Sequence, residues 1–249
     1  MTIIKSAEEI AVMREAGRIV AVILQKMSEA VRPGIKTREL DEIAEKEIGK
    51  YSSARPSFKG YHNFPASICV SVNDEVVHGI PGNKVLKEGD LVSLDFGVIY
   101  KGFQGDAAIT VGVGKISEDA RKLMQVTEAS LMKGIGAACD GGYLGDIGAA
   151  IQGYVEEQGF SIVREYSGHG IGRDMHEDPL VPNFGRNGEG MKLSEGMTLA
   201  LEPMVNKGGW KTKLNANGWT VHTADKSLSA HFEHTIAIRK SETEILTLL

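Results

Sequence analysis

Leu91-Val-Ser-Leu-Asp95-Phe-Gly97 is followed, after the turn-forming pair Lys101-Gly102, by a second β-rich stretch, Gly105-Asp106-Ala-Ala-Ile-Thr110. Each stretch carries one carboxylate inside an otherwise apolar, alternating pattern. A hairpin that turns at Lys101-Gly102 would bring Asp95 and Asp106 side by side. Two adjacent buried carboxylates repel each other unless a proton or a cation lies between them. We therefore predict an antiparallel hairpin that carries an ionic site, although either aspartate alone is more often a turn or cap residue.

The order of elements around this hairpin is the same in the two halves of the chain. The box Ser6-Ala-Glu-Glu9 predicts the start of a helix, and Thr37 and Ser117 are predicted caps of two further helices. A fourth, shorter helix is expected to end near Gly159. Each helix pair precedes β-rich segments, which are residues 67–72, 91–98 and 105–111 in the first half and 161–166, 197–201, 218–223 and 231–238 in the second.

Two helices followed by strands, twice, predict an α+β fold with pseudo-symmetric halves at about 1–112 and 113–249. The two halves share little residue identity, and many α+β chains show this order without any duplication. We find no linker between the halves, because the Gly- and Asn-rich residues 183–192 are typical of an exposed loop. The prediction is a single domain spanning residues 1–249.

The composition argues against several classes of protein. The chain has 249 residues, of which 42% are hydrophobic, and a formal net charge of -5. This content is enough to bury a substantial core, and the negative balance argues against binding driven by nucleic-acid phosphates. Only Cys69 and Cys139 are present, so a disulfide framework or a thiolate-rich structural zinc site is not expected.

Neither a targeting segment nor a membrane span is evident in the sequence. Residues 1–5 lack the basic and long apolar segments of a secretory signal, and the apolar run at 19–24 is too short to cross a bilayer. We therefore expect a cytoplasmic monomer that has no membrane or nucleic-acid partner.

A histidine-containing stretch, Tyr166-Ser-Gly-His-Gly-Ile-Gly-Arg-Asp-Met-His-Glu-Asp-Pro179, has the character of a site. Its two histidines, His169 and His176, are seven residues apart, which fits no compact zinc motif. Further ligands must therefore come from elsewhere in the chain. Two candidates are Glu202, at the end of the apolar run 197–201, and Glu233, inside the segment 231–238. Either glutamate alone is more often an edge or ion-paired residue.

Four carboxylates on four strand segments, together with one glycine-flanked histidine, favour a shared metal site. Four negative charges approximately balance two divalent cations, and this donor set suits Mn, Fe(II), Co or Zn. Two such ions can lower the pKa of a shared water and polarise a carbonyl group, which is the chemistry of hydrolysis. His78 and His176 are candidates for hydrogen bonding to the reacting groups, although a lone histidine is more often structural. We interpret His62, His222, His231 and His234 as structural or supporting.

Aromatic and sulfur-containing side chains occur near the candidate ligand strands, and they are predicted to line an apolar pocket. They are Tyr61, Phe64, Cys69, Met175 and Trp219. Ordinary core packing is the alternative for any one of them.

These residues together resemble the methionine aminopeptidases. The resemblance rests on the ordered set of five candidate ligands, on Val72-Asn-Asp-Glu-Val-Val-His-Gly-Ile-Pro81, Ser167-Gly-His-Gly-Ile-Gly172 and Phe232-Glu-His-Thr235, and it runs from about Ser6 to the C-terminus. The short chain is most similar to the bacterial type I form. The resemblance implies a pita-bread fold with a central antiparallel sheet, and removal of the initiator methionine from nascent polypeptides whose second residue is small.

The same resemblance implies a role for each site residue. Two divalent ions would be held by Asp95, Asp106, His169, Glu202 and Glu233, with Asp106 and Glu233 bridging. The groups that act on the substrate would be His78 at the amide nitrogen, His176 at the carbonyl, and Glu202 as acceptor of the water proton. The methionine pocket would be lined by Tyr61, Phe64, Cys69 and Trp219.

Two positions depart from the pattern of the family. Met175 replaces a bulky aromatic residue, and Gln104 stands where many members have histidine.

Transient ribosome contact follows from the substrate, although no basic tail or zinc-finger extension marks it. The alternatives are a related peptidase that is specific for proline, and a pita-bread protein that binds without catalysis.

Overall fold

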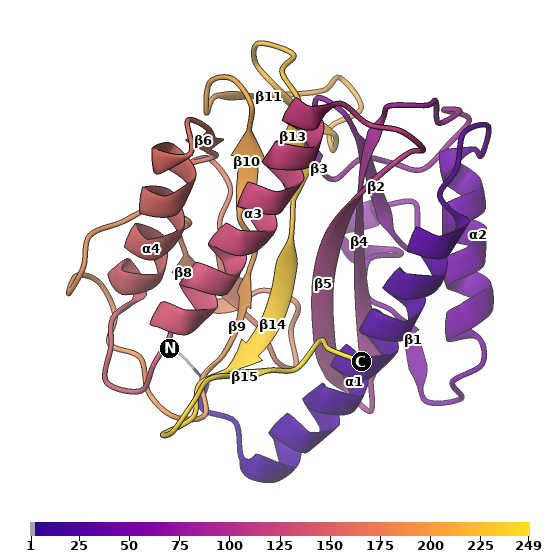
Figure 1. The fold of residues 1–249 in the computed structure, drawn as a ribbon. Helices are drawn as coiled ribbons and strands as arrows, with labels where there is room; N and C mark the ends of the chain where they lie inside the picture. The colour runs from indigo at the N-terminus through magenta and orange to yellow at the C-terminus, as the bar shows by residue number, and fades with distance from the viewer. Residues whose placement is uncertain (1–2) are drawn as a thin grey trace.

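The computed structural model describes residues 3–249, and a nine-stranded antiparallel sheet lies at its centre (Figure 1). The strands of its main path are ordered β1-β4-β5-β14-β9-β7-β8, with β2 also paired to β4 and β15 to β14. Their bounds are β1 Ala54–Pro56, β2 Cys69–Val72, β4 Leu91–Tyr100, β5 Phe103–Gly112, β7 Gly168–Gly170, β8 Glu177–Val181, β9 Thr198–Leu201, β14 Glu233–Ala237 and β15 Glu244–Ile245.

Two three-stranded sheets accompany the central one. The first has the order β13-β10-β6 and the second β11-β12-β3. Their strands are β3 Glu75–Val77, β6 Ser161–Ile162, β10 Met204–Asn206, β11 Thr212–Leu214, β12 Val221–Thr223 and β13 Ser229–His231. A short 3-10 helix, η1 Tyr61–Asn63, lies between β1 and β2.

Two helix pairs cover the sheet, one in each half of the chain. They are α1 Ala7–Ala30 with α2 Thr37–Ile48, and α3 Glu118–Ala137 with α4 Leu144–Glu157. Figure 1 shows α1 and α3 crossing the same face of the large sheet. The first pair packs in one apolar cluster with the β4 side chains Val92, Leu94 and Phe96, and the second pair packs in another with Leu199, Leu201 and Ile236. Since Val92, Leu94 and Phe96 face the helices, alternation turns Asp95 to the opposite face of the sheet.

Two of the three predicted helix caps are confirmed. Ser6 accepts a hydrogen bond from the Glu9 amide and forms the complete capping box, and Ser117 accepts one from the Ala120 amide. The predicted cap at Thr37 is wrong, because Lys36 precedes the first residue of α2. The Thr37 hydroxyl instead forms two hydrogen bonds with the backbone of Gly82: it donates to the carbonyl oxygen and accepts from the N–H group.

The predicted hairpin is confirmed. β4 and β5 pair along their whole length, and Lys101 and Gly102 form the turn with φ angles of 47° and 82°. Positive φ at both central residues matches the right-handed twist of the two strands. Asp95 pairs with Ala108 and Asp106 with Gly97, so the two aspartates are diagonal neighbours on one face.

Several strands are shorter than the sequence predicts. In the predicted segment 161–166 only β6 is a strand, and the predicted strand 231–238 is split at Phe232. The split has a topological cause, because β13 pairs with β10 in a small sheet whereas β14 pairs with β9 in the large one. The chain therefore changes sheets at this residue. Of the helices described in residues 3–249, none is long and apolar enough to cross a membrane.

Candidate metal centre and pocket

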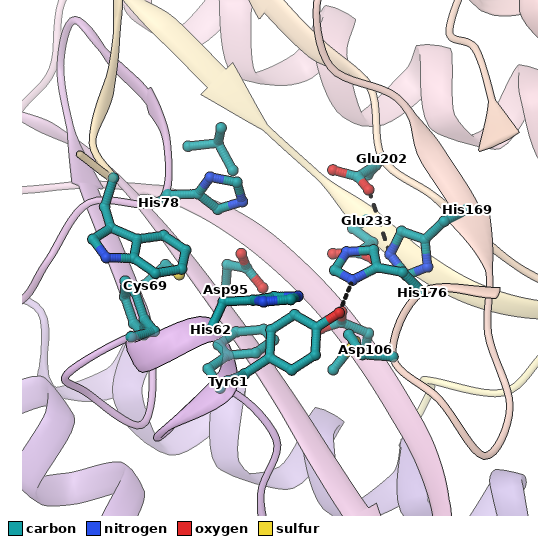
Figure 2. A pocket seen from close by; sticks show the side chains of 15 residues that line it. Tyr61, His62, Cys69, His78, Asp95, Asp106, His169, His176, Glu202 and Glu233 are labelled. Atoms are coloured by element: carbon teal, nitrogen blue, oxygen red, sulfur yellow. Dashed lines mark hydrogen bonds and ion pairs between the residues drawn. The ribbon is translucent and has the colours of Figure 1, made fainter. Parts of the chain in front are cut away.

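A cavity of about 290 Å³ opens on the face of the large sheet that carries Asp95 and Asp106. All twelve side chains predicted for the site or its pocket line this cavity, although their roles remain predictions (Figure 2). They are Tyr61, Phe64, Cys69, His78, Asp95, Asp106, His169, Met175, His176, Glu202, Trp219 and Glu233. Phe58, His62 and Val77 complete the wall.

Strand register explains why acidic residues that are distant in sequence meet in this cavity. Ala108 of β5 pairs with Asp95 on one side and with Glu233 of β14 on the other. Asp106 is two residues from Ala108 on the same strand, so its side chain lies on the same face. The small side chain of Ala108 thus leaves space between three carboxylates.

The second half of the site is built in a similar way around Ala200 of β9. Ala200 pairs with His169 of β7 on one side and with Thr235 of β14 on the other. Glu202 follows two residues later, just beyond the end of β9. Its backbone carbonyl accepts a hydrogen bond of 3.1 Å from the Asn183 side chain, which fixes the chain at this point.

The carboxylates lack the partners that buried charges normally have. Asp95, Asp106 and Glu233 are 8%, 5% and 2% exposed. One oxygen of each has no hydrogen-bond partner in the part of the chain that the structure describes. An unpaired buried carboxylate is costly, and burial therefore favours its neutral form.

The pKa values of all four acidic groups are raised. Desolvation raises the pKa of Asp95 to about 7. Desolvation and the neighbouring carboxylates raise the pKa values of Asp106, Glu202 and Glu233 well above their usual range. Four buried carboxylates repel one another when no cation is present, whereas a divalent cation between them would stabilise their charged forms. The residues therefore fit a metal centre.

His169 supplies a nitrogen to the same cluster. Its Nδ1 lies 2.9 Å from the Gly170 carbonyl oxygen and donates to it, which leaves Nε2 without the hydrogen. This Nε2 is 3.6 Å from Glu202 Oε1. Burial lowers the pKa of His169 to about 3, so the ring is neutral and can ligate a metal.

Three of the five predicted ligands meet in one compact cluster. Asp106, His169 and Glu233 each offer a ligand atom within 4.8 Å of the others. Asp95 and Glu202 line the same cavity outside this trio. The candidate ligands are thus a compact trio, together with Asp95 from β4 and Glu202 just after β9.

The other two candidate histidines lie on opposite walls of the cavity (Figure 2). His78 directly follows β3 with a φ of 58°, and burial lowers its pKa to about 4. The His176 ring lies 4.3 Å from the His169 ring, and burial lowers its pKa as well. Its Nδ1 is 2.7 Å from the Tyr61 hydroxyl oxygen. Burial thus favours the neutral form of both rings, which can exchange hydrogen bonds with a substrate.

One end of the cavity is apolar. The Phe64 and Trp219 rings meet edge to face with centroids 5.1 Å apart, and Cys69 lies in the same cluster. Burial and the adjacent Asp95 raise the pKa of the Cys69 thiol, so this side chain stays neutral. A thioether side chain would fit such a surface, because sulfur interacts favourably with aromatic rings.

The two positions that depart from the expected pattern have different surroundings. Met175 is buried and lines the cavity, where its terminal methyl lies against Gly97 of β4. Gln104 does not line the cavity. Its amide side chain accepts from Ser57 and donates to the Arg173 carbonyl, and its backbone N–H donates to Gly172, so Gln104 ties β5 to the loop that carries His176.

The four histidines interpreted as structural or supporting differ in their relation to the site. His231 is fully buried and its Nε2 lies 3.7 Å from Glu202 Oε2, while His62 lies in the cavity wall. His222 bonds Asp74 and Asn215, and His234 bonds Thr247. Sequence reasoning missed the support that Asn183 gives to Glu202, and no local pattern points to it.

The sequence pattern of metallopeptidase family M24 matches residues 11–240. The chain belongs to this family. The methionine aminopeptidase of Clostridium perfringens (strain 13 / Type A) is 56% identical over 249 residues, which are all of both proteins. The crystal structure of the methionine aminopeptidase from Rickettsia prowazekii superimposes with a TM-score of 0.98, 44% identity and full coverage of both chains. The α+β pita-bread fold expected from the sequence is thereby confirmed.

A more distant member of the family gives a contrast. The Xaa-Pro dipeptidase from Bacillus anthracis superimposes with a TM-score of 0.77 and 25% identity. The match covers 98% of this chain but only 61% of the dipeptidase. The chain therefore matches methionine aminopeptidases over their whole length and this dipeptidase over part of it.

Proposed function

We propose that this chain is a methionine aminopeptidase, which hydrolyses the first peptide bond of nascent polypeptides and releases their initiator methionine. One observation carries the proposal: a cluster of buried carboxylates with unpaired oxygens adjoins an apolar pocket of aromatic and sulfur-containing side chains. The first feature is suited to metal-assisted hydrolysis and the second to a methionine side chain. The full-length similarity to proteins with this name supports it further.

Two divalent ions are proposed as cofactors. Their ligands would be Asp95, Asp106, His169, Glu202 and Glu233, with Asp106 and Glu233 shared between the ions. When bound, the ions supply Lewis acidity, which lowers the pKa of a water molecule and polarises the substrate carbonyl. The oxygen-rich donor set with one imidazole suits Mn, Fe(II), Co or Zn, and availability in the cell decides among them.

The substrate is bound and oriented by side chains on the two sides of the cluster. The methionine side chain enters the space between Phe64, Cys69 and Trp219, where it leaves water. Tyr61 closes the same pocket beside His176. The scissile carbonyl is then held over the carboxylates. A small second residue is favoured because the remainder of the substrate must pass the wall that His62 and His176 form.

Three side chains take part in proton transfer or hydrogen bonding during the reaction. Glu202 takes a proton from the attacking water on a carboxylate oxygen, and the leaving amine finally takes up a proton. His176 donates a hydrogen bond to the carbonyl oxygen as negative charge develops there. His78 contacts the scissile amide nitrogen from the opposite wall.

The cellular setting follows from the substrate. We propose that residues 1–249 form one catalytic domain that works as a monomer in the cytoplasm on polypeptides emerging from the ribosome. A transient contact with the ribosome is part of this proposal, since the substrate is available only during or soon after synthesis.

Cleavage before proline is the alternative within the family. The aromatic pocket for an extended side chain argues against it, as does the 56% identity to the methionine aminopeptidase of Clostridium perfringens. A binding protein without catalysis would not need the acidic cluster with its unpaired oxygens.

A peptide assay tests the proposal. The purified protein, supplied with Mn, Co, Fe(II) or Zn, should release free methionine from Met-Ala-Ser, and chelation should stop the release. A peptide with proline at the second position and a residue other than methionine at the first should be cleaved poorly. Absence of methionine release with all four metals would refute the proposed activity, and preferential cleavage before proline would favour the alternative.

A further inference from the structure

The hydrogen bond between Tyr61 and His176 has a functional meaning beyond the lining of the pocket. The hydroxyl oxygen of Tyr61 lies 2.7 Å from Nδ1 of His176, and the ring centroids are 5.5 Å apart with an interplanar angle of 32° (Figure 2). The contact is therefore made through the polar tip of Tyr61, while its ring remains available to the apolar pocket.

Tyr61 is held in place by its own tight turn. It is the first residue of η1 and follows Gly60, whose φ of 85° is in the left-handed region. The Tyr61 N–H donates to the Phe58 carbonyl, and its carbonyl accepts from Phe64. The turn thus fixes the backbone from which the tyrosine ring projects.

His176 is held from the opposite direction by the residue that follows it. The carboxylate of Glu177 forms a buried ion pair with Lys5. It also accepts the backbone N–H groups of Arg173 and Asp174, which closes the loop immediately before His176. Since both partners are anchored independently, the Tyr61–His176 contact is a built feature of the pocket rather than an encounter of two mobile side chains.

This contact allows two arrangements of its hydrogens, because either the Tyr61 hydroxyl or Nδ1 of His176 can be the donor. A neutral imidazole carries hydrogen on one nitrogen only, and a tyrosine hydroxyl has one hydrogen to donate. Among residues 3–249, Nδ1 of His176 is the sole hydrogen-bond partner of the Tyr61 hydroxyl. If the hydroxyl donates to Nδ1, its hydrogen is used and the imidazole hydrogen must lie on Nε2.

We propose that Tyr61 is a positioning residue, which holds His176 as the tautomer with hydrogen on Nε2 and aims that N–H at the substrate carbonyl oxygen. This inference rests on the proposed function. The opposite tautomer would present a lone pair from Nε2 and would repel the developing negative charge. One hydroxyl group thereby decides whether the histidine can act as a donor.

Nitrogen NMR tests the tautomer directly. Zinc-loaded protein labelled with ¹⁵N-histidine is suitable, because zinc is diamagnetic, and the His176→Ala spectrum identifies the His176 signals. In the unmodified protein we expect a bare Nδ1 and a protonated Nε2, and in Tyr61→Phe we expect a mixture of both tautomers. Hydrogen on Nδ1 of His176 in the unmodified protein would overturn the proposal, as would an identical tautomer ratio in Tyr61→Phe.

Kinetics separate positioning from simple pocket lining. Tyr61→Phe keeps the ring and removes one hydrogen bond, so kcat for Met-Ala-Ser should fall roughly 3- to 10-fold while KM stays within about twofold. Tyr154→Phe, which removes a hydroxyl from a tyrosine of α4 outside the cavity, should change neither constant. An unchanged kcat in Tyr61→Phe would overturn the positioning role. An inactive unmodified protein would refute the proposed function instead, and the NMR result would still decide the tautomer.

Discussion

Removal of the divalent ions should make the folded protein progressively less stable as the pH rises. Burial raises the folded-state pKa of Asp95 from 3.8 to about 7, and it raises those of Asp106, Glu202 and Glu233 as well. Between the unfolded and folded pKa values, the folded protein binds more protons than the unfolded chain. The free energy of unfolding must therefore decrease with increasing pH through this window.

Asp95 indicates the size of the effect. A carboxyl group whose pKa is about 7 in the folded protein and 3.8 in the unfolded chain accounts for about 4 kcal/mol of lost stability once the pH exceeds the folded pKa. For a chain of this length, that loss lowers the melting temperature by roughly 10 °C. The other three carboxylates act in the same direction. Divalent ions should reverse the trend, because they would bind the charged carboxylates of the folded state.

Thermal unfolding monitored by circular dichroism measures this dependence. Melting temperatures would be recorded from pH 5 to pH 8 in chelator and again with Mn²⁺ or Zn²⁺. In chelator the melting temperature should fall across this range, and the metal should increase it most at pH 8. A melting temperature of the metal-free protein that stays constant or rises between pH 6 and pH 8 would contradict a cluster of buried carboxylates with unpaired oxygens.

A neutral substitution isolates the contribution of the cluster. At pH 8 in chelator, Asp95→Asn should be more stable than the unmodified protein, because it removes one buried charge, and it should gain less stability from metal. Glu128→Gln removes a carboxylate from an exposed position of α3, so it should follow the unmodified protein at every pH. If Asp95→Asn and Glu128→Gln changed stability with pH in the same way, the pH dependence would arise outside the carboxylate cluster.

Further substitutions test individual parts of the site. Lys5→Met leaves the buried Glu177 carboxylate without the cation of its ion pair, so it should cost about 3 to 5 kcal/mol in chemical denaturation, and Lys5→Met/Glu177→Gln should recover part of this loss. Equal stability of Lys5→Met and the unmodified protein would contradict the ion pair. His176→Ala should lower kcat strongly while elemental analysis finds unchanged metal content; full activity would reject its role. Glu202→Gln should abolish turnover, and a rate near that of the unmodified protein would exclude it as proton acceptor.

The parts of the fold that sequence analysis predicted correctly are encoded locally. The hairpin was predictable because the turn pair Lys101-Gly102 lies between two alternating strands, and the register then determines the diagonal pairing of Asp95 and Asp106. The caps at Ser6 and Ser117 likewise depend on a hydroxyl and the amide three residues later. Such signals need no knowledge of distant residues.

The errors occurred where tertiary contacts compete with local preferences. Thr37 has a suitable side chain for a cap, but its hydroxyl bonds Gly82 from a different part of the chain. The apolar pattern of residues 231–238 favours one strand, yet pairing with two different sheets divides it at Phe232. Neither outcome can be recognised from a window of neighbouring residues.

Within the site, residue types were predictable whereas several contacts were not. Carboxylates in apolar strands are unusual enough to indicate a site by themselves. The hydroxyl contact of Tyr61 with His176 joins positions 115 residues apart. The hydrogen bond from the Asn183 side-chain amide to the Glu202 backbone carbonyl joins positions 19 apart. These contacts depend on loop conformation, which no sequence periodicity encodes.

Anomalous diffraction from crystals soaked in Mn²⁺ tests the central claim most directly. The claim is that two divalent ions bind between the carboxylates of β4, β5 and β14, the glutamate after β9 and the histidine of β7. We predict two anomalous peaks there, within coordinating distance of Asp95, Asp106, His169, Glu202 and Glu233. Peaks only at other places on the protein, or a cavity without any peak at saturating Mn²⁺, would contradict the account.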